Sequence, residues 1–265
     1  MRSFQDCISD TKYLFDNGKS RNGCSKIYYS SNEDLQEIFS FLDFKGKRVL
    51  SVVGSGDQAI AFYNCDVKSL DLFDINPLTI YYYYLRIWHM MYYGELYIDQ
   101  KNFFDIIKRV LKYVNPSNND ELNAYNYWMS FIELFDGKDL DKIFYNSFYN
   151  LGSCSLNYGN ILKNFHLNNC NFYNFDLSSD ISLNKKYDVV YTSNIVDYIK
   201  ADMLAKYRDN IYGLLNNGGF LVCSNVGTFD YNENEKEIFE KKFTRCDIPS
   251  SNSYWFSPGK IYIKK

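Results

Sequence analysis

The chain has 265 residues, of which 46% are hydrophobic and 19% aromatic, enough for the core of one large domain or of one domain with an insertion. Its formal net charge is -3, its isoelectric point is about 5.5 and its basic residues are scattered, which argues against broad nucleic-acid binding. Seven cysteines without a CxxC pair give no pattern for a zinc or redox site, so we expect no metal.

The amino-terminal stretch MRSFQDCISD lacks the apolar core of a signal peptide. No apolar run approaches the roughly 20 residues needed to span a bilayer. Free, reduced thiols suit the cytosol. We therefore expect a cytoplasmic protein without an integral membrane segment.

Residues 1–45 are expected to form a helical lead-in. Ser31 or Asn32 can cap a helix there, with Glu33 in its first turn, where the helix dipole favours an acid. Apolar residues then recur at helical spacing. They are Leu35, Ile38, Phe39 and Leu42.

The next elements alternate between strand and helix. Arg48–Val53 is predicted as a strand, Gln58–Asn64 as a short helix and Ser69–Asp74 as a second strand. Asn76 and Pro77 have the types typical of a helix cap and first position. The helix that they begin is expected to run to Tyr93 and to end at Gly94.

Residues 95–150 contain no convincing strand, and their apolar spacing predicts a helical insertion. Beyond it, helices are expected at 157–167 and 202–215, the second ended by the NNGG turn at 216–219. Further strands are expected at 170–175, 187–194, 220–226, 241–248 and 260–265.

Alternating strands and helices predict a parallel sheet covered on both faces. The expected fold is α/β: a Rossmann-like, doubly wound, mostly parallel sheet in a single domain over 1–265, with the helical insertion and a carboxy-terminal antiparallel hairpin. Ligands of such sheets bind beyond the carboxyl ends of the strands, at the switch point.

Four polar segments each follow a predicted strand and are expected to lie near one another. Each also has a simpler interpretation, as a tight turn, a helix cap or an exposed loop acid. The four are Gly54-Ser55-Gly56-Asp57-Gln58, Asp74, Asp176, and Ser193-Asn194-Ile195-Val196-Asp197-Tyr198.

Two cofactor classes fit these segments. Gly54-x-Gly56-x-x-Ala59 with Asp74 fits a dinucleotide fingerprint, so an NAD enzyme is one hypothesis. S-adenosylmethionine, a nucleoside-like cofactor without pyrophosphate, is the other. The long helix opened by Asp74-Ile75-Asn76-Pro77, the NNGG turn and the short last strands favour it.

The chain resembles the class I S-adenosylmethionine-dependent methyltransferase fold and, more narrowly, the group related to the aminocarboxypropyl transferases of betaine-lipid synthesis. It departs from the common pattern at Ser51, where an acid is usual, and in lacking a third glycine. The segments that carry the resemblance are YYSSNEDL (28–35), VLSVVGSGDQAIAF (49–62), LFDINPLTIYYYYLRI (72–87), YDVVYTSNIVDYI (187–199) and NNGGFLV (216–222).

The resemblance implies a cofactor cradle. In it, Gly54, Ser55, Gly56, Asp57 and Gln58 line the methionine and ribose, and Asp74 holds the ribose hydroxyls. Ile75 and Asn76 flank the adenine, and Asp176 and Leu177 contact its edge. Asn194, Asp197 and Tyr198 face the transfer site, and Tyr29, Glu33 and Asp34 close over it. Ser193 and Asn194 are also expected to contact the cofactor.

The implied activity is transfer of a methyl group, or of an aminocarboxypropyl group, to a small-molecule or lipid-like acceptor. Alignment supplies much of the barrier reduction, and a base is needed only when the nucleophile carries a proton. Candidate bases are Asp197, Tyr198, Tyr29 and Glu33. A catalytically silent binding protein is a third hypothesis, and the sequence does not define the oligomeric state.

Overall fold

The structure is a computed structural model, and it describes residues 2–31, 33, 35–145, 158–167, 170–224, 233–247 and 259–265. The chain divides into two compact units. Unit 1 comprises Met1–Ser31, Val53–Asp57 and Asp74–Asn150, and unit 2 comprises Asn32–Val52, Gln58–Phe73 and Leu151–Lys265. The prediction of a single domain remains a prediction, and each unit is described by itself.

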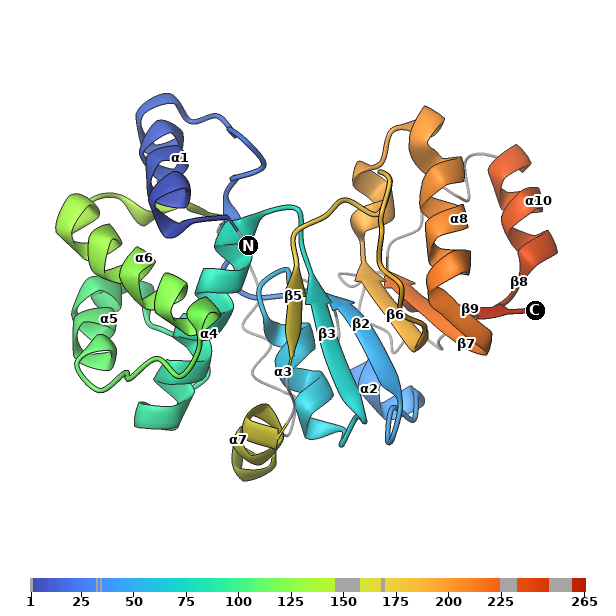
Figure 1. Ribbon diagram of the computed structural model, residues 1–265, viewed down its shortest axis with the longest axis horizontal. Helices are drawn as coiled ribbons and strands as arrows, with labels where there is room; N and C mark the ends of the chain where they lie inside the picture. Colours follow the sequence, from blue (N-terminus) through green and yellow to red (C-terminus); the bar gives the residue numbers. More distant parts are fainter. Residues whose placement is uncertain are drawn as a thin grey trace. The chain divides into compact units, whose positions relative to one another are not determined.

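Unit 2 holds a seven-stranded sheet with the order β5-β3-β2-β6-β7-β9-β8. Its first five strands pair in parallel, and β9 pairs antiparallel with both β7 and β8. Figure 1 shows the parallel strands in succession, with α8 alongside β6 and β7. The strands are β2 (Arg48–Val52), β3 (Ser69–Phe73), β5 (Asn171–Tyr173), β6 (Tyr187–Ser193), β7 (Leu215–Ser224), β8 (Phe243–Asp247) and β9 (Gly259–Lys264).

The central strands are apolar on both faces because helices cover the sheet. Val49 and Leu50 of β2 and Val189 and Val190 of β6 are all buried, and consecutive residues of a strand point to opposite faces. The chain order reverses between the neighbours β2 and β6, which makes this the switch point where such sheets bind ligands. The α/β fold with a mostly parallel sheet is therefore confirmed.

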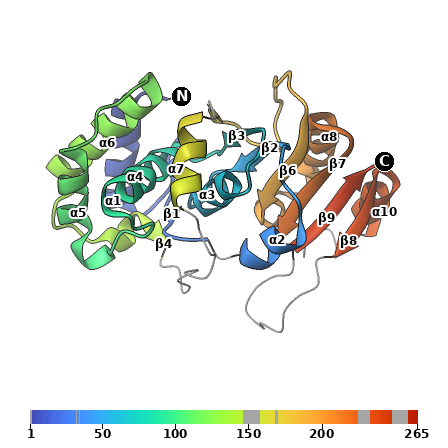
Figure 2. The same ribbon diagram turned by 90° about the horizontal axis from the view of Figure 1, so that it is seen from below.

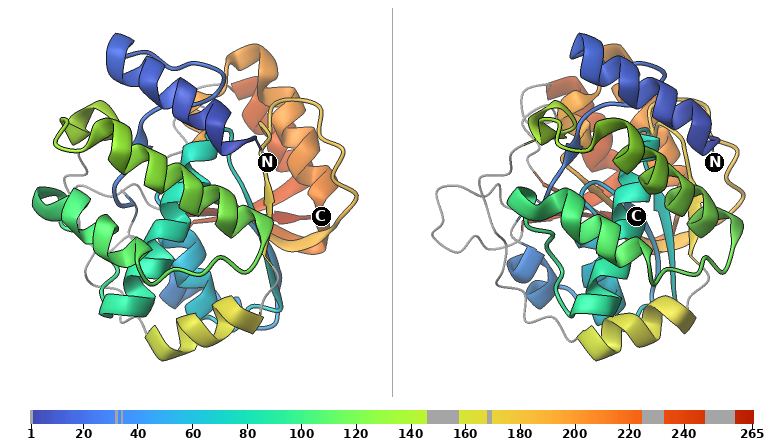
Figure 3. Two further views of the ribbon diagram at one scale, coloured as in Figure 1. Left: turned by 60° about the vertical axis from the view of Figure 1, so that its left-hand side comes forward. Right: turned by 90° about the vertical axis from the view of Figure 1, so that its left-hand side faces the viewer.

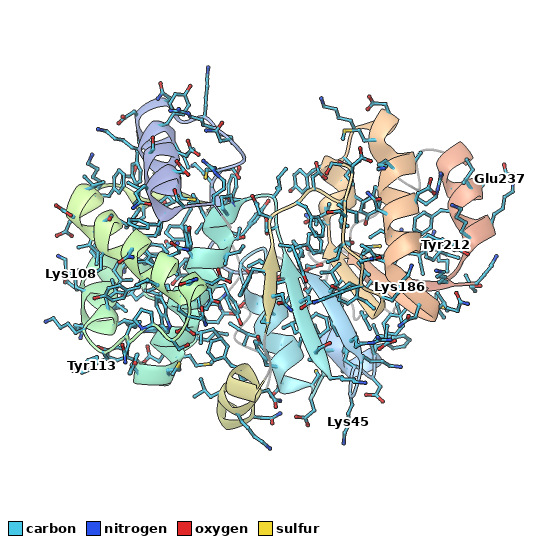
Figure 4. All side chains as sticks on the ribbon, in the orientation of Figure 1. Lys45, Lys108, Tyr113, Lys186, Tyr212 and Glu237 are labelled. Atoms are coloured by element: carbon cyan, nitrogen blue, oxygen red, sulfur yellow. The ribbon has the colours of Figure 1, made fainter. Side chains whose placement is uncertain are left out.

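The carboxy-terminal hairpin β8–β9 is also confirmed, and Figure 2 shows β7, β9 and β8 following one another beside α10. Phe239 of α10 stacks on Phe243 of β8 and meets Tyr262 of β9 edge-on. Lys264 donates to the carbonyl of Tyr212, a residue of α8 labelled in Figure 4, at 2.8 Å.

The helices of unit 2 mostly alternate with its strands along the sequence. They are α2 (Leu35–Phe41), α3 (Asp57–Asn64, whose first residue belongs to unit 1), α7 (Tyr158–Leu167), α8 (Leu204–Leu214) and α10 (Glu233–Lys242), with the short η3 (Ile195–Tyr198) and η4 (Ala201–Met203).

Unit 1 is mainly helical and is organised by α4, which is buried from Pro77 to Met90. A helix that is apolar nearly all round needs neighbours on every side. Trp128 of α6 donates its indole N–H to the carbonyl of Tyr81 in α4 at 2.8 Å. The elements are α1 (Phe4–Asn17), β1 (Ile27–Tyr28), α4 (Pro77–Tyr93), η1 (Gln100–Asn102), α5 (Phe103–Leu111), α6 (Asn119–Phe135), η2 (Leu140–Lys142) and β4 (Phe144–Tyr145).

In Figure 3, α6 lies between α1 and α5, and it packs against both. Lys108 of α5, labelled in Figure 4, forms an ion pair with Asp136 at the end of α6. The helical pattern predicted after residue 95 thus appears as α5 and α6, while residues 146–150 lie outside the described part of the chain.

Several predicted boundaries were wrong. Helix α2 covers only Leu35–Phe41, and Asn32, one of its two predicted caps, lies outside the described residues. The NNGG turn lies within β7, because Leu215 pairs with Tyr187 while Phe220 pairs with Val189, so that four residues bulge out. Gly219 fits this bulge because a Cβ there would lie about 3 Å from backbone oxygens of Asn216 and Asp188.

Strands β1 and β4 and helix α10 are among the described elements that were not predicted. Strands β1 and β4 have two residues each and pair with one another, too short for an alternating pattern. Helix α10 is strongly charged, so its apolar spacing is weak.

Candidate functional site

The turn after β2 needs its two glycines for backbone geometry. Gly54 has φ 54° and Gly56 has φ 89°, both in the region that disfavours other residues. The Gly56 N–H closes the turn on the Val53 carbonyl at 2.7 Å. A Cβ on Gly56 would also contact Tyr83 of α4 at 3.4 Å. The tight-turn interpretation of the two glycines therefore agrees with the structure, and a ligand contact at Gly54 remains a prediction.

Asp74 lies directly after β3 and bonds to this turn. Its Oδ2 accepts the Gly54 N–H at 3.0 Å, and its Oδ1 accepts the Asn76 N–H at 2.9 Å. Its residue surface is only 8% exposed. Burial raises the pKa of Asp74 to about 6, against the lowering effect of these two hydrogen bonds.

Ile75 and Asn76 differ in how they are used. The Asn76 side chain accepts the Leu78 N–H at 3.2 Å, which caps α4 as predicted, and donates to the Ser25 carbonyl at 3.0 Å. Asn76 is buried, whereas Ile75 is 55% exposed. The apolar face offered to a flat ring at this turn is therefore that of Ile75.

Ser55 and Asp57 are engaged within the turn itself. The Ser55 hydroxyl donates to Asp57 Oδ2 at 2.8 Å, and the backbone N–H of Ser31 donates to the same oxygen at 2.5 Å. Arg86 of α4 donates to Asp57 Oδ1 at 2.6 Å and to the Ser55 carbonyl at 2.7 Å. The carboxylate of Asp57 therefore links the glycine turn to Ser31 and Arg86 by hydrogen bonds.

Arg86 is the residue that the sequence analysis missed. The available signal was a single cation inside the aromatic and aliphatic run YYYYLRIWHMM. A charge buried in such a helix requires a partner, and the structure shows that this partner is Asp57.

Glu33 and Gln58, predicted to play separate roles, meet in unit 2. Glu33 Oε2 accepts a hydrogen bond from the Gln58 side-chain amide at 2.8 Å and another from the Tyr191 hydroxyl at 3.2 Å. All three residues are buried. Asp34, predicted beside Glu33, lies outside the described residues.

Tyr29 belongs to unit 1 and is partly buried. Its carbonyl accepts the hydroxyl of Tyr82 at 3.0 Å. Burial raises the pKa of Tyr29 to about 12, so its phenol is protonated at neutral pH. A protonated phenol can donate a hydrogen bond, and the role of Tyr29 as a base remains a prediction.

Asp176 and Leu177 form a turn after β5 in unit 2. Asp176 Oδ1 accepts the backbone N–H and the hydroxyl of Ser178, both at 2.7 Å. Leu177 is buried, and its carbonyl accepts the amide of Asn210. This is the turn-forming role that loop aspartates often have, and contact with an adenine edge remains a prediction.

The fourth predicted polar segment, residues 193–198, begins at the end of β6 and continues through η3. Ser193 has φ 53°, unusual for a residue with a side chain and a conformation often found at functional sites. Asn194 precedes η3, which carries a partly buried Asp197. Tyr198 is 68% exposed. Their roles at the transfer site remain predictions.

The remaining observations concern His89, metal ligands and membrane-spanning helices. His89 of α4 is buried and stacks on Tyr93. Over the described ranges, no three His, Cys, Asp or Glu side chains gather in a way that could hold a metal ion. Among the helices that the structure describes, none combines the length and hydropathy needed to cross a bilayer.

The sequence matches no model of a known protein family and no curated protein. Similar solved structures include a TehB-like SAM-dependent methyltransferase from Corynebacterium glutamicum ATCC 13032 Kitasato, with 11% identity and a TM-score of 0.46 over 99% of this chain and 98% of that one. The glycopeptide N-methyltransferase MtfA, complexed with S-adenosyl-L-homocysteine, has 7% identity and a TM-score of 0.49 over 90% and 92%.

A third similar structure is the magnesium protoporphyrin IX methyltransferase ChlM from Synechocystis PCC 6803 with bound SAM. It has 11% identity and a TM-score of 0.46 over 99% of this chain and 79% of that one. At these identities and TM-scores we infer no activity from them.

Proposed function

We propose that this chain is an S-adenosylmethionine-dependent transferase of the methyltransferase class that acts on a small-molecule or lipid-like acceptor. The observation that carries the proposal is the bond from the Gly54 N–H to Asp74 Oδ2. It joins the glycine turn to a buried acid at the start of α4, the two features that bind a nucleoside in sheets of this kind.

The described side chains fit an adenosyl group. Asp74 is a buried carboxylate held by the backbone N–H groups of Gly54 and Asn76, and a carboxylate in this place can accept ribose hydroxyls. Ile75 offers exposed apolar surface to the adenine. Gly54 and its turn would line the ribose and the methionine part. When bound, the sulfonium of this cofactor supplies carbons activated for attack by a nucleophile.

The strand order favours this cofactor over NAD. The dinucleotide fold has the order 3-2-1-4-5-6. Here the last strand, β9, lies antiparallel between β7 and β8, which gives 3-2-1-4-5-7-6 for the strands of the sheet in chain order.

Asp197 and Tyr198 are the proposed side chains for the acceptor. Asp197 can take a proton from a protonated nucleophile, and the exposed Tyr198 can orient the acceptor. Ser193 and Asn194 provide further polar groups on the same segment. Aminocarboxypropyl transfer, implied by the sequence resemblance, uses the same cofactor and remains the alternative chemistry.

Titration calorimetry with S-adenosylmethionine, S-adenosylhomocysteine and NAD tests the proposal. We expect the first two to bind and NAD not to bind; binding of NAD alone would overturn it. With a panel of acceptors, S-adenosylhomocysteine as by-product identifies methyl transfer, and methylthioadenosine identifies aminocarboxypropyl transfer. Cytoplasmic location and the oligomeric state are separate questions.

A further inference from the structure

Arg86 is a fully buried cation, with 0% of its side chain exposed. Its Nη1 donates to the Ser55 carbonyl, its Nη2 to Asp57 Oδ1 and its Nε to the Leu96 carbonyl at 3.4 Å. Burial by itself lowers the pKa of Arg86, but the charge of Asp57 raises it above its ordinary value. The ion pair therefore persists in the protein interior.

The guanidinium of Arg86 forms hydrogen bonds with two residues of the glycine turn, Ser55 and Asp57. Ser55 lies between Gly54 and Gly56, both in the left-handed region. Glycines give a chain great conformational freedom, which must be lost when the turn is ordered. A planar fork can bond the Ser55 carbonyl and the Asp57 carboxylate together, which a lysine ammonium cannot do with the same geometry.

The same turn meets the rest of unit 1 through Asp57. Its Oδ2 accepts the Ser31 N–H, and its Oδ1 also lies 3.4 Å from the Tyr97 hydroxyl. Arg86 thus bonds to Ser55 and Asp57 of the turn. At the first residue of the turn, the Gly54 N–H donates to Asp74.

We propose that Arg86 is a positioning residue that holds Gly54–Asp57 in the conformation in which Gly54 meets Asp74, and so sets the affinity for the adenosyl cofactor. The inference rests on the proposed function. Arg86 does not touch the cofactor; it acts through the Ser55 carbonyl and the Asp57 carboxylate.

A neutralised pair separates positioning from stability. Arg86→Met leaves the Asp57 charge buried alone, so we expect strong destabilisation. In Arg86→Met/Asp57→Asn both charges are gone, and the new amide can still accept the Ser31 N–H and donate to Tyr97. We expect the double variant to regain most of the unfolding temperature, yet to bind S-adenosylhomocysteine about 10- to 100-fold more weakly than the original protein, because the hydrogen bond from Arg86 to the Ser55 carbonyl is lost.

Hydrogen exchange adds a readout without ligand. The peptide that contains residues 53–57 should exchange faster in the double variant than in the original protein. Arg86→Lys should lie between the two in affinity, since it keeps the charge and loses the fork. Trp128→Phe is the matched control: it removes a buried bond to α4 away from the turn, so it should lower the unfolding temperature and leave the affinity unchanged.

Full recovery of affinity together with stability in the double variant would overturn the positioning role, as would an affinity that follows stability in Trp128→Phe. If the original protein binds neither S-adenosylmethionine nor S-adenosylhomocysteine, the proposed function fails instead. Hydrogen exchange at residues 53–57 then still tests whether Arg86 holds the turn. Equal exchange rates in the original protein and the double variant refute this, and faster exchange in the variant supports it.

Discussion

The turn after β3 and the segment after β6 each carry an acid with a predicted role in the same reaction, but the two are built differently. Asp74 is buried and bonded on both oxygens to backbone N–H groups. Asp197 lies partly buried in a four-residue 3-10 helix, next to the exposed Tyr198. Fixed backbone donors suit a group that is the same in every turnover, whereas exposed side chains suit recognition of a particular acceptor.

Of the substitutions that test this comparison, we expect the largest effect on cofactor affinity from one at Asp74. We expect Asp74→Ala to weaken binding of S-adenosylhomocysteine by about 1–3 kcal/mol, because a charged acceptor for two hydroxyls is lost. Asp197→Ala is the matched comparison and should leave that affinity nearly unchanged while reducing turnover. Calorimetry measures both variants, and an unchanged affinity in a folded Asp74→Ala protein would remove Asp74 from the site.

The glycine turn should be sensitive to a single methyl group. Gly56→Ala places a Cβ at positive φ and 3.4 Å from Tyr83, so we expect a loss of about 1–3 kcal/mol of unfolding free energy. Gly18→Ala controls for the backbone strain, because Gly18 has φ +65° and nothing within 4 Å of the added Cβ. Chemical denaturation should give the smaller loss for Gly18→Ala; equal losses would mean that the contact with Tyr83 is unimportant.

The raised pKa of Asp74 predicts how cofactor binding depends on pH. A ribose donates hydroxyls to the carboxylate, so affinity should be greatest above pH 6 and fall by up to about tenfold per unit as the pH falls through about 6. This fall should be absent in Asp74→Asn. Calorimetry between pH 5 and pH 8 tests it, and a flat profile in the original protein would contradict it.

The same shift has the opposite effect on folding. Since the carboxyl pKa rises from 3.8 in the unfolded chain to about 6 in the folded protein, ionisation of Asp74 costs stability as the pH rises between these values. Protonation of Asp74 at low pH therefore stabilises the fold, and a loss of cofactor affinity there does not arise from unfolding by this group.

The smallest effect on the fold is expected at Tyr198. Tyr198→Phe removes a hydroxyl from an exposed side chain, so the unfolding temperature and the cofactor affinity should stay within error. Turnover should fall if the hydroxyl orients the acceptor. Steady-state kinetics with a substrate found by the acceptor screen measures this, and unchanged turnover would remove Tyr198 from the proposed site.

The sequence by itself determined the alternation of strands and helices, the cap and first position of α4 at Asn76 and Pro77, and the placement of Asp74 after a buried strand. These features depend on local spacing and on residue type, which a single sequence displays. The long helix was predicted to run from Pro77 to about Tyr93, and this is confirmed because the cap, the proline and Gly94 mark its two ends.

Only the tertiary structure decided what each polar side chain bonds to. Ser55 and Asp57 were predicted as ligand contacts, and the structure shows that the Ser55 carbonyl and the Asp57 carboxylate also bond to Arg86, which is about thirty residues further along the chain. Glu33 and Gln58 looked like members of separate groups, yet they share a buried hydrogen bond. Such partners are chosen by long-range packing, because a buried polar atom bonds to whichever group the fold brings within reach, and sequence spacing does not encode that distance.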